Sequence, residues 1–122
     1  MAYDPTNIFA RILRGEVPSK KVYEDAHVLA FHDIRPLTPV HVLVIPKGAY
    51  VDMEDFTARA SDAEIVALMR AVGKVARELG LAESGYRILA NTGADANQEV
   101  LHLHIHVFGG RNVGPMLKRT ES

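Results

Sequence analysis

The sequence lacks cysteine, lacks tryptophan, and has no long apolar run. Without cysteine the chain can form no disulfide, no thiolate metal site and no cysteine nucleophile. Lys and Arg total 14 against 15 Asp and Glu, and this balance argues against a general binder of nucleic acid. No apolar run approaches the roughly 20 residues that span a bilayer, and residues 1–5 have no signal-peptide pattern. We therefore expect a cytoplasmic protein that binds neither nucleic acid nor membrane.

The rest of the composition is typical of a folded domain. The chain has 122 residues, of which 48% are apolar and 24% charged. This length suits one domain whose core needs no covalent staple. We expect a single domain over residues 1–122, with a C-terminal tail from about residue 111.

Hydrophobic periodicity and turn residues predict seven elements in the order α-β-β-β-α-β-β. A short helix follows Thr6 as N-cap, covers residues 8–13 and stops at Gly15. Five strands are predicted at residues 21–24, 28–33, 41–45, 86–90 and 101–108. Residues 41–45 are apolar on both faces after the first residue, as in a central strand. This order predicts an α+β fold with a mostly antiparallel five-stranded sheet, one long helix and one short helix.

The long helix has the clearest signals. It begins after Ser61, which forms a capping-box pattern with Glu64, and it ends at Gly80. Its apolar stripe must cover a sheet or a partner helix. The stripe consists of Ile65, Leu68, Met69, Val72, Val75, Ala76 and Leu79.

Three histidines, His102, His104 and His106, alternate with apolar residues near the end of the chain. Residues two apart on a strand share a face, so the imidazoles are expected on one face and the apolar residues on the other. Such a face could be a set of solvated side chains. It could hold zinc if His41 or Asp33 converged on it. It could also carry a nucleophilic imidazole whose opposite nitrogen gives its proton to a fixed acceptor.

The run His-Leu-His-Ile-His-Val-Phe at 102–108 resembles the signature of the histidine triad (HIT) superfamily. The resemblance extends over nearly the whole chain, through residues 7–19, 30–47, 85–91 and 98–100. Residues 109–111 and 114–117 resemble bacterial members of the Hint branch. A third histidine, where the nucleotidylyltransferase branch has Gln, favours a hydrolase. One departure is Asn97, where the family often has Gly.

The resemblance implies a role for each matching residue. His104 is expected to be the nucleophile on the α-phosphorus, supported by His102, with His106 and His41 completing the catalytic set. Asp33 is expected to hold the ribose hydroxyls. The base pocket is expected to be formed by Ile8, Phe9, Ile12, Phe31, His32 and Ile34. Phosphate or the leaving group is expected to be bound by Asn91, Asn97, Gln98 and Glu99.

The activity that the resemblance implies is that of a purine nucleoside phosphoramidase. Such an enzyme forms a nucleotidyl-histidine intermediate from an adenosine or guanosine 5′-phosphoramidate and needs no metal or other cofactor. The resemblance also implies a homodimer whose sheet continues across both chains. The alternatives are a dinucleoside polyphosphate hydrolase with the same nucleophile, a nucleotide-binding or interaction module without catalysis, and, weakest of all, a zinc-binding module.

Overall fold

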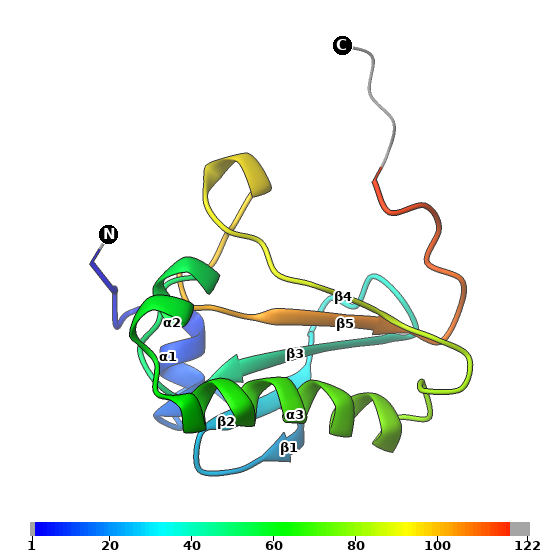
Figure 1. Cartoon of the computed structure of the whole chain (residues 1–122), viewed down its shortest axis with the longest axis horizontal. Coiled ribbons are helices and arrows are strands. Elements are labelled where there is room, and N and C mark those ends of the chain that lie inside the picture. The colour runs from blue at the N-terminus through cyan, green and yellow to red at the C-terminus, as the bar shows by residue number, and fades with distance from the viewer. Residues whose placement is uncertain (1, 118–122) are drawn as a thin grey trace.

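The fold is organised around one antiparallel sheet, and the computed structural model describes residues 2–117 (Figure 1). The strands are β1 (Lys21–Glu24), β2 (Val28–His32), β3 (Val40–Pro46), β4 (Arg87–Leu89) and β5 (Ile105–Gly109). They lie in the order β1-β2-β3-β5-β4, and every neighbouring pair is antiparallel. The predicted five-stranded sheet is therefore confirmed. Residues 118–122 of the predicted tail lie outside the described part of the chain.

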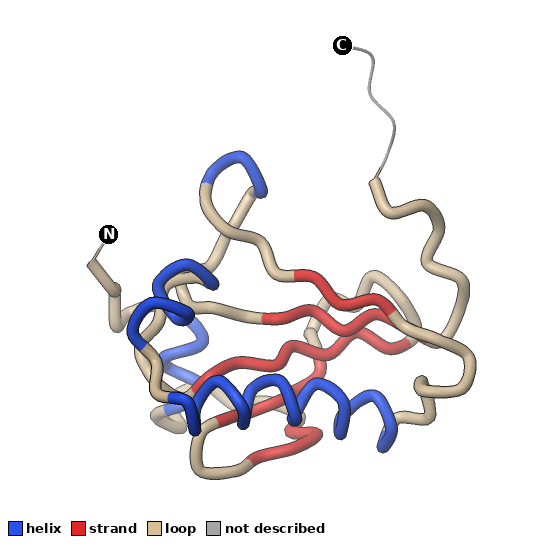
Figure 2. Tube along the Cα trace, viewed as in Figure 1, coloured by secondary structure: helices blue, strands red, loops and turns tan. Residues whose placement is uncertain are grey.

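The described residues also form three α-helices and one turn of 3-10 helix; the longest helix runs across the strands, and the 3-10 turn lies on a loop that projects away from them (Figure 2). They are α1 (Ile8–Leu13), α2 (Met53–Arg59), α3 (Asp62–Glu78) and η1 (Ala94–Ala96). The capping box at the start of α3 is confirmed, with Ser61 and Glu64 each bonded to the other's backbone N–H. None of these helices, within residues 2–117, is long and apolar enough to cross a membrane.

Alternation along the strands divides the buried residues into two clusters, one on each face of the sheet. Val42 and Val44 of β3 face α3, together with Leu103, Ile105 and Val107. Leu43 and Ile45 face the other way and pack with Phe9 of α1 and Phe31 of β2. Strand β3 is buried on both faces, as its apolar run predicts. The face that α1 covers is also the face that receives the histidines.

Some predicted boundaries and contacts were wrong. The N-cap of α1 is Asn7 rather than Thr6, because the Asn7 side chain accepts the Ala10 N–H. The last strand begins at Ile105 and not at residue 101, and the Leu103 N–H donates to the Tyr50 carbonyl, outside the sheet, at 2.8 Å. Met69 is 47% exposed, although the rest of the predicted stripe packs against the sheet or the core beside it.

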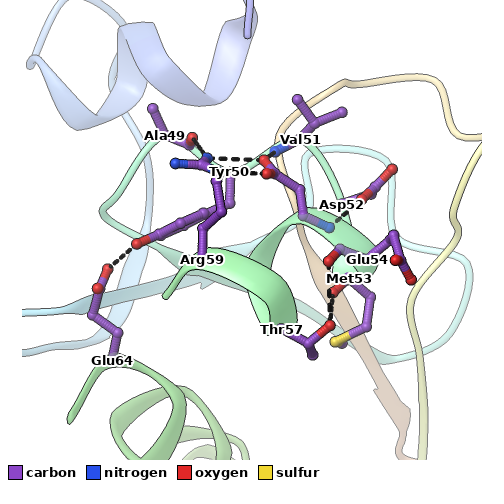
Figure 3. Close-up of polar contacts among 10 residues, drawn as sticks. Ala49, Tyr50, Val51, Asp52, Met53, Glu54, Thr57, Arg59 and Glu64 are labelled. Carbon is purple, nitrogen blue, oxygen red and sulfur yellow. Dashed lines mark hydrogen bonds and ion pairs between the residues drawn. The ribbon is translucent and has the colours of Figure 1, made fainter. Parts of the chain in front are cut away.

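Helix α2 has no counterpart in the sequence-based prediction, and its side chains bond to the chain that precedes it, at residues 49–51 (Figure 3). The Asp55 carboxylate accepts the Val51 N–H and pairs with Arg59, which also donates to the Ala49 carbonyl. These bonds hold residues 49–51, where the Tyr50 carbonyl receives the Leu103 N–H. The α2 region therefore fixes the backbone between His102 and His104.

Candidate active site

Four histidines and two phenylalanines form a continuous aromatic group on the α1 face of the sheet. The rings of His104 and His106 are 5.0 Å apart, and those of His106 and His41 are 5.2 Å apart. Phe9 meets His104 edge-on at 4.9 Å. Phe108 stacks on His106 with an angle of 4° between the rings. The order along the face follows from the register, because His41 pairs with Phe108 and Leu43 pairs with His106.

The His104 ring has one nitrogen held by the backbone. Its Nδ1 lies 2.8 Å from the His102 carbonyl oxygen. A carbonyl can only accept, so Nδ1 carries the proton and Nε2 has a free lone pair. His104 is 7% exposed, and its side chain lines a cavity described below. A neutral imidazole oriented in this way is suited to act as a nucleophile.

A second chain of hydrogen bonds runs through His41 and His106. The Leu37 N–H donates to Nδ1 of His41 at 3.1 Å, so the His41 proton is on Nε2. That nitrogen lies 2.9 Å from Nδ1 of His106 and donates to it. The proton of neutral His106 is then on Nε2, where it can be donated to a ligand.

Burial keeps this set of histidines neutral. Desolvation lowers the pKa of His102 to about 4. Desolvation, with a smaller effect from His104 and His41, lowers that of His106 to about 4 as well. The pKa values of His104 and His41 are also lowered, mainly by burial, and the Asp33 carboxylate opposes the shift at both. At neutral pH the site therefore presents lone pairs and neutral donors rather than imidazolium charge.

Asp33 is placed beside the histidines by a turn after β2. One carboxylate oxygen accepts the Arg35 N–H at 2.8 Å, and the other lies 3.6 Å from Nε2 of His41. One ligand atom each from Asp33, His41 and His106 lies within 4.8 Å of the others, a spacing that could hold a metal ion. In the structure described, these atoms are engaged with one another through the contacts above, and Asp33 keeps acceptor capacity toward the cleft.

A cavity of about 350 Å³ opens over His104 and His106. This volume lies within the usual range for small-molecule sites. Its walls include ten of the residues predicted from the sequence, which are Ile8, Phe9, Ile12, Phe31, His32, Asp33, Ile34, Glu99, His104 and His106. A larger hollow of about 710 Å³ shares the wall around Asp33 and reaches His41. One end of the cleft is thus apolar and the other end carries the imidazoles.

Other predicted residues lie outside the smaller cavity. His102 is fully buried beneath it, and Asn91 and Asn97 are not among its lining residues. Gln98 braces a loop, since its amide donates to the Val51 and Val100 carbonyls and accepts the Gly93 N–H. Asn97 is the one non-glycine among residues 2–117 with a positive φ, 54°, a conformation that asparagine tolerates well.

Sequence reasoning missed several wall residues and one contact beneath the site. The cavity is also lined by Val17, Pro18, Ser19, Leu43 and Val100. Residues 17–19 lie in the short loop after α1. The neighbouring apolar residues Val17 and Pro18 were a sequence signal for a wall of the cavity. Tyr3, whose hydroxyl contacts the His102 ring, had no local signal, because the two residues are 99 positions apart.

Comparison with known proteins gives matches over most of the chain. The family model described as "HIT domain" matches residues 14–113. An uncharacterized HIT-like protein of Azospirillum brasilense is 70% identical over 96% of each chain. A protein of Escherichia coli K12 named purine nucleoside phosphoramidase is 43% identical, covering 90% of this chain and 92% of the relative.

Solved structures show the same fold. A HIT family hydrolase from Clostridium thermocellum superposes with a TM-score of 0.84 at 41% identity, covering 93% of this chain and 97% of the other. A histidine triad protein from Clostridium difficile gives a TM-score of 0.79 at 39% identity, covering 98% and 100%.

The lowered histidine pKa values predict that acid destabilises the protein. His102 has a pKa of about 4 when folded and about 6.5 when unfolded, so the unfolded chain binds its proton first. The contribution of His102 to the free energy of unfolding should therefore fall as the pH drops from 6.5 to 4 and change no further below 4. Urea unfolding at pH 7 and 4.5 measures this loss. In His102→Asn the loss should be about 2 kcal/mol smaller than in the wild type.

The matched control is Leu37→Ala, which changes an exposed apolar side chain and no titratable group. It should lose as much stability on acidification as the wild type. An equal loss in the wild type and in His102→Asn would contradict the assignment.

Proposed function

This chain belongs to the HIT family, and from that premise we propose that it is a nucleotide hydrolase that cleaves purine nucleoside 5′-phosphoramidates. The products are the nucleoside monophosphate and an amine. The proposal rests chiefly on the His104 hydrogen bond, which leaves the Nε2 lone pair unblocked at the edge of a cavity of nucleotide-binding size. The E. coli relative named purine nucleoside phosphoramidase supports the choice of a P–N bond.

The apolar end of the cleft suits the purine base of the substrate, and the end with the imidazoles suits its phosphoryl group. The purine base lies among the apolar side chains at the α1 end, which include Phe9, Ile12 and Phe31. The ribose hydroxyls donate to Asp33, whose carboxylate keeps acceptor capacity. With the base and the ribose in this orientation, the α-phosphorus lies near His104 and His106. Glu99 lines the same cavity and is exposed, at the side from which an amine can leave.

Catalysis proceeds in two displacements. Nε2 of His104 attacks the α-phosphorus, the N–P bond to the ring forms, and the bond to the amine breaks with its electron pair leaving on nitrogen. The departing amine takes a proton that the His41–His106 pair carries. Bound phosphoryl charge raises the pKa of that pair, so it can hold one extra proton near neutral pH. Water then cleaves the nucleotidyl-histidine bond, and its proton returns to the pair.

Replacing the nucleophile tests the proposal. His104→Ala should lower kcat for an adenosine 5′-phosphoramidate with a fluorogenic amine by several orders of magnitude, because no other group takes over the attack. Affinity for AMP, measured by calorimetry, should persist, since the base and ribose contacts remain. The assay contains a chelator, so that adventitious metal contributes nothing.

His27→Gln, remote from the cleft, is the control and should keep wild-type turnover. Turnover of a diadenosine polyphosphate in place of the phosphoramidate would shift the assignment to the related hydrolase. Tight AMP binding by a wild type that hydrolyses neither substrate would indicate a binding module.

We also propose that the protein is a homodimer, on the basis of an uncovered apolar surface. Ile88 of β4 pairs with Val107 and therefore lies on the α3 face of the sheet. Within the described residues, α3 packs over β1, β2 and β3, and Ile88 is 47% exposed. Val66 and Met69 are exposed on α3. Strand β4 is also an edge strand of the sheet that residues 2–117 form, and a second copy can add a strand to such an edge.

The dimer predicts a solution mass of twice 13.4 kDa at micromolar concentration. Light scattering after gel filtration measures this mass. Ile88→Lys should shift the protein toward a single chain, because a charge is then buried at the interface. Leu37→Lys, at an exposed apolar residue in the loop after Pro36, should leave the mass unchanged. A wild-type mass of one chain would exclude the dimer.

A further inference from the structure

The N-terminal segment before α1 reaches the underside of the candidate active site. The hydroxyl of Tyr3 lies 2.6 Å from Nδ1 of His102, and the two rings meet edge-on with centroids 5.6 Å apart. Tyr3 is half-buried and His102 is fully buried. The mechanism above uses His102 only through its backbone carbonyl, so the purpose of this side-chain contact is unassigned.

The hydrogen bonds of His102 fix its tautomer. Its Nε2 lies 2.8 Å from the Pro46 carbonyl oxygen, which can only accept, so Nε2 carries the proton. Nδ1 is then a lone pair, and the phenol O–H of Tyr3 donates to it. The ring is held at both nitrogens, by the end of β3 on one side and by the N-terminal segment on the other.

The position of His102 matters because the sheet does not hold it. Strand β5 begins at Ile105, so the backbone of His102 lies outside the ladder of strand hydrogen bonds. Its carbonyl nevertheless accepts the Nδ1–H of His104. The orientation of the nucleophile therefore depends on a residue that is fixed mainly through its own side chain and through the Leu103 N–H bond to Tyr50.

Tyr3 is itself held in place. The Asp4 carbonyl accepts both the backbone N–H and the side-chain amide of Asn7, the residue that caps α1. The Asp4 carboxylate accepts from Thr6. The same helix carries Phe9, which contacts the rings of His102 and His104. The turn before α1 and the helix thus present Tyr3 and Phe9 to the triad as one unit.

We propose that Tyr3 is a positioning residue for the nucleophile, acting through His102. Its hydroxyl fixes the His102 ring, the ring fixes the His102 carbonyl, and the carbonyl holds His104 with Nε2 toward the phosphorus. The inference rests on the proposed role of His104. Small displacements of a reacting group lower the rate of the chemical step more than they lower substrate binding, so the contact should act on kcat.

Tyr3→Phe tests the proposal, because it keeps the ring and removes only the hydroxyl. Against the fluorogenic adenosine phosphoramidate, kcat should fall about tenfold, while KM and AMP affinity should stay within about twofold of the wild type. The control is Tyr23→Phe. Tyr23 is also half-buried, and its hydroxyl donates to Asp25 at 2.8 Å, but it lies on β1. Its kcat should equal that of the wild type.

A spectroscopic arm reports on the contact without turnover. With ¹⁵N-labelled histidine, wild-type His102 should show a protonated Nε2 and a hydrogen-bonded imine Nδ1. In Tyr3→Phe the Nδ1 resonance should move toward that of a free imine, and the Nδ1–H proton of His104 should exchange faster with water. Tyr23→Phe should show neither change. If the wild type does not hydrolyse the substrate, the proposed function fails, and this arm alone decides the positioning role.

A structural role alone predicts a different pattern. Tyr3→Phe would then lower the melting temperature but leave kcat and the His104 Nδ1–H exchange rate at wild-type values. That result overturns the proposal. So does a wild-type Nδ1 resonance of His102 that is already that of a free imine.

Discussion

The proposed chemistry of the cleft depends on one hydrogen bond, that from Nδ1–H of His104 to the His102 carbonyl. It fixes which nitrogen of His104, the proposed nucleophile, has a lone pair and where that lone pair points. The carbonyl lies between the sheet and the loops, so its position requires support from elsewhere. The Tyr50 carbonyl binds the next residue, the Pro46 carbonyl binds the His102 ring, and Tyr3 binds the other side of that ring. Segments far apart in sequence thus orient a single imidazole.

One face of the sheet carries the larger hydrophobic core, and the opposite face carries the cavity with the histidines. Leu103, Ile105 and Val107 enter the cluster under α3, and this alternation forces His104 and His106 to the opposite face. There, burial lowers the histidine pKa values and keeps the rings uncharged. In the proposed mechanism, the charge of a bound phosphoryl group shifts the His41–His106 pair back toward protonation, while His104 stays neutral. The occupied site would then hold a neutral nucleophile beside a proton donor.

Residue patterns predicted the sheet, α3 and the grouping of the histidines because these depend on periodicity. Alternation around His104 identified the shared face, and the capping box located the start of α3. The start of β5 was predicted four residues too early, because strand-forming residues there bond to a loop. Helix α2 was missed because its seven residues bury only Phe56. Tyr3 could not have been found, since its partner is defined by tertiary packing alone.

The proposed mechanism requires a covalent bond between Nε2 of His104 and the α-phosphorus. The most direct measurement is the intact mass of the protein during turnover of a slow phosphoramidate, quenched in base because phosphoryl-imidazole bonds are labile in acid. We expect a species heavier by one nucleoside monophosphoryl group, which peptide fragmentation locates on His104 and which disappears as substrate is exhausted. Turnover that proceeds with no adduct at any time, or an adduct on a different residue, would contradict it.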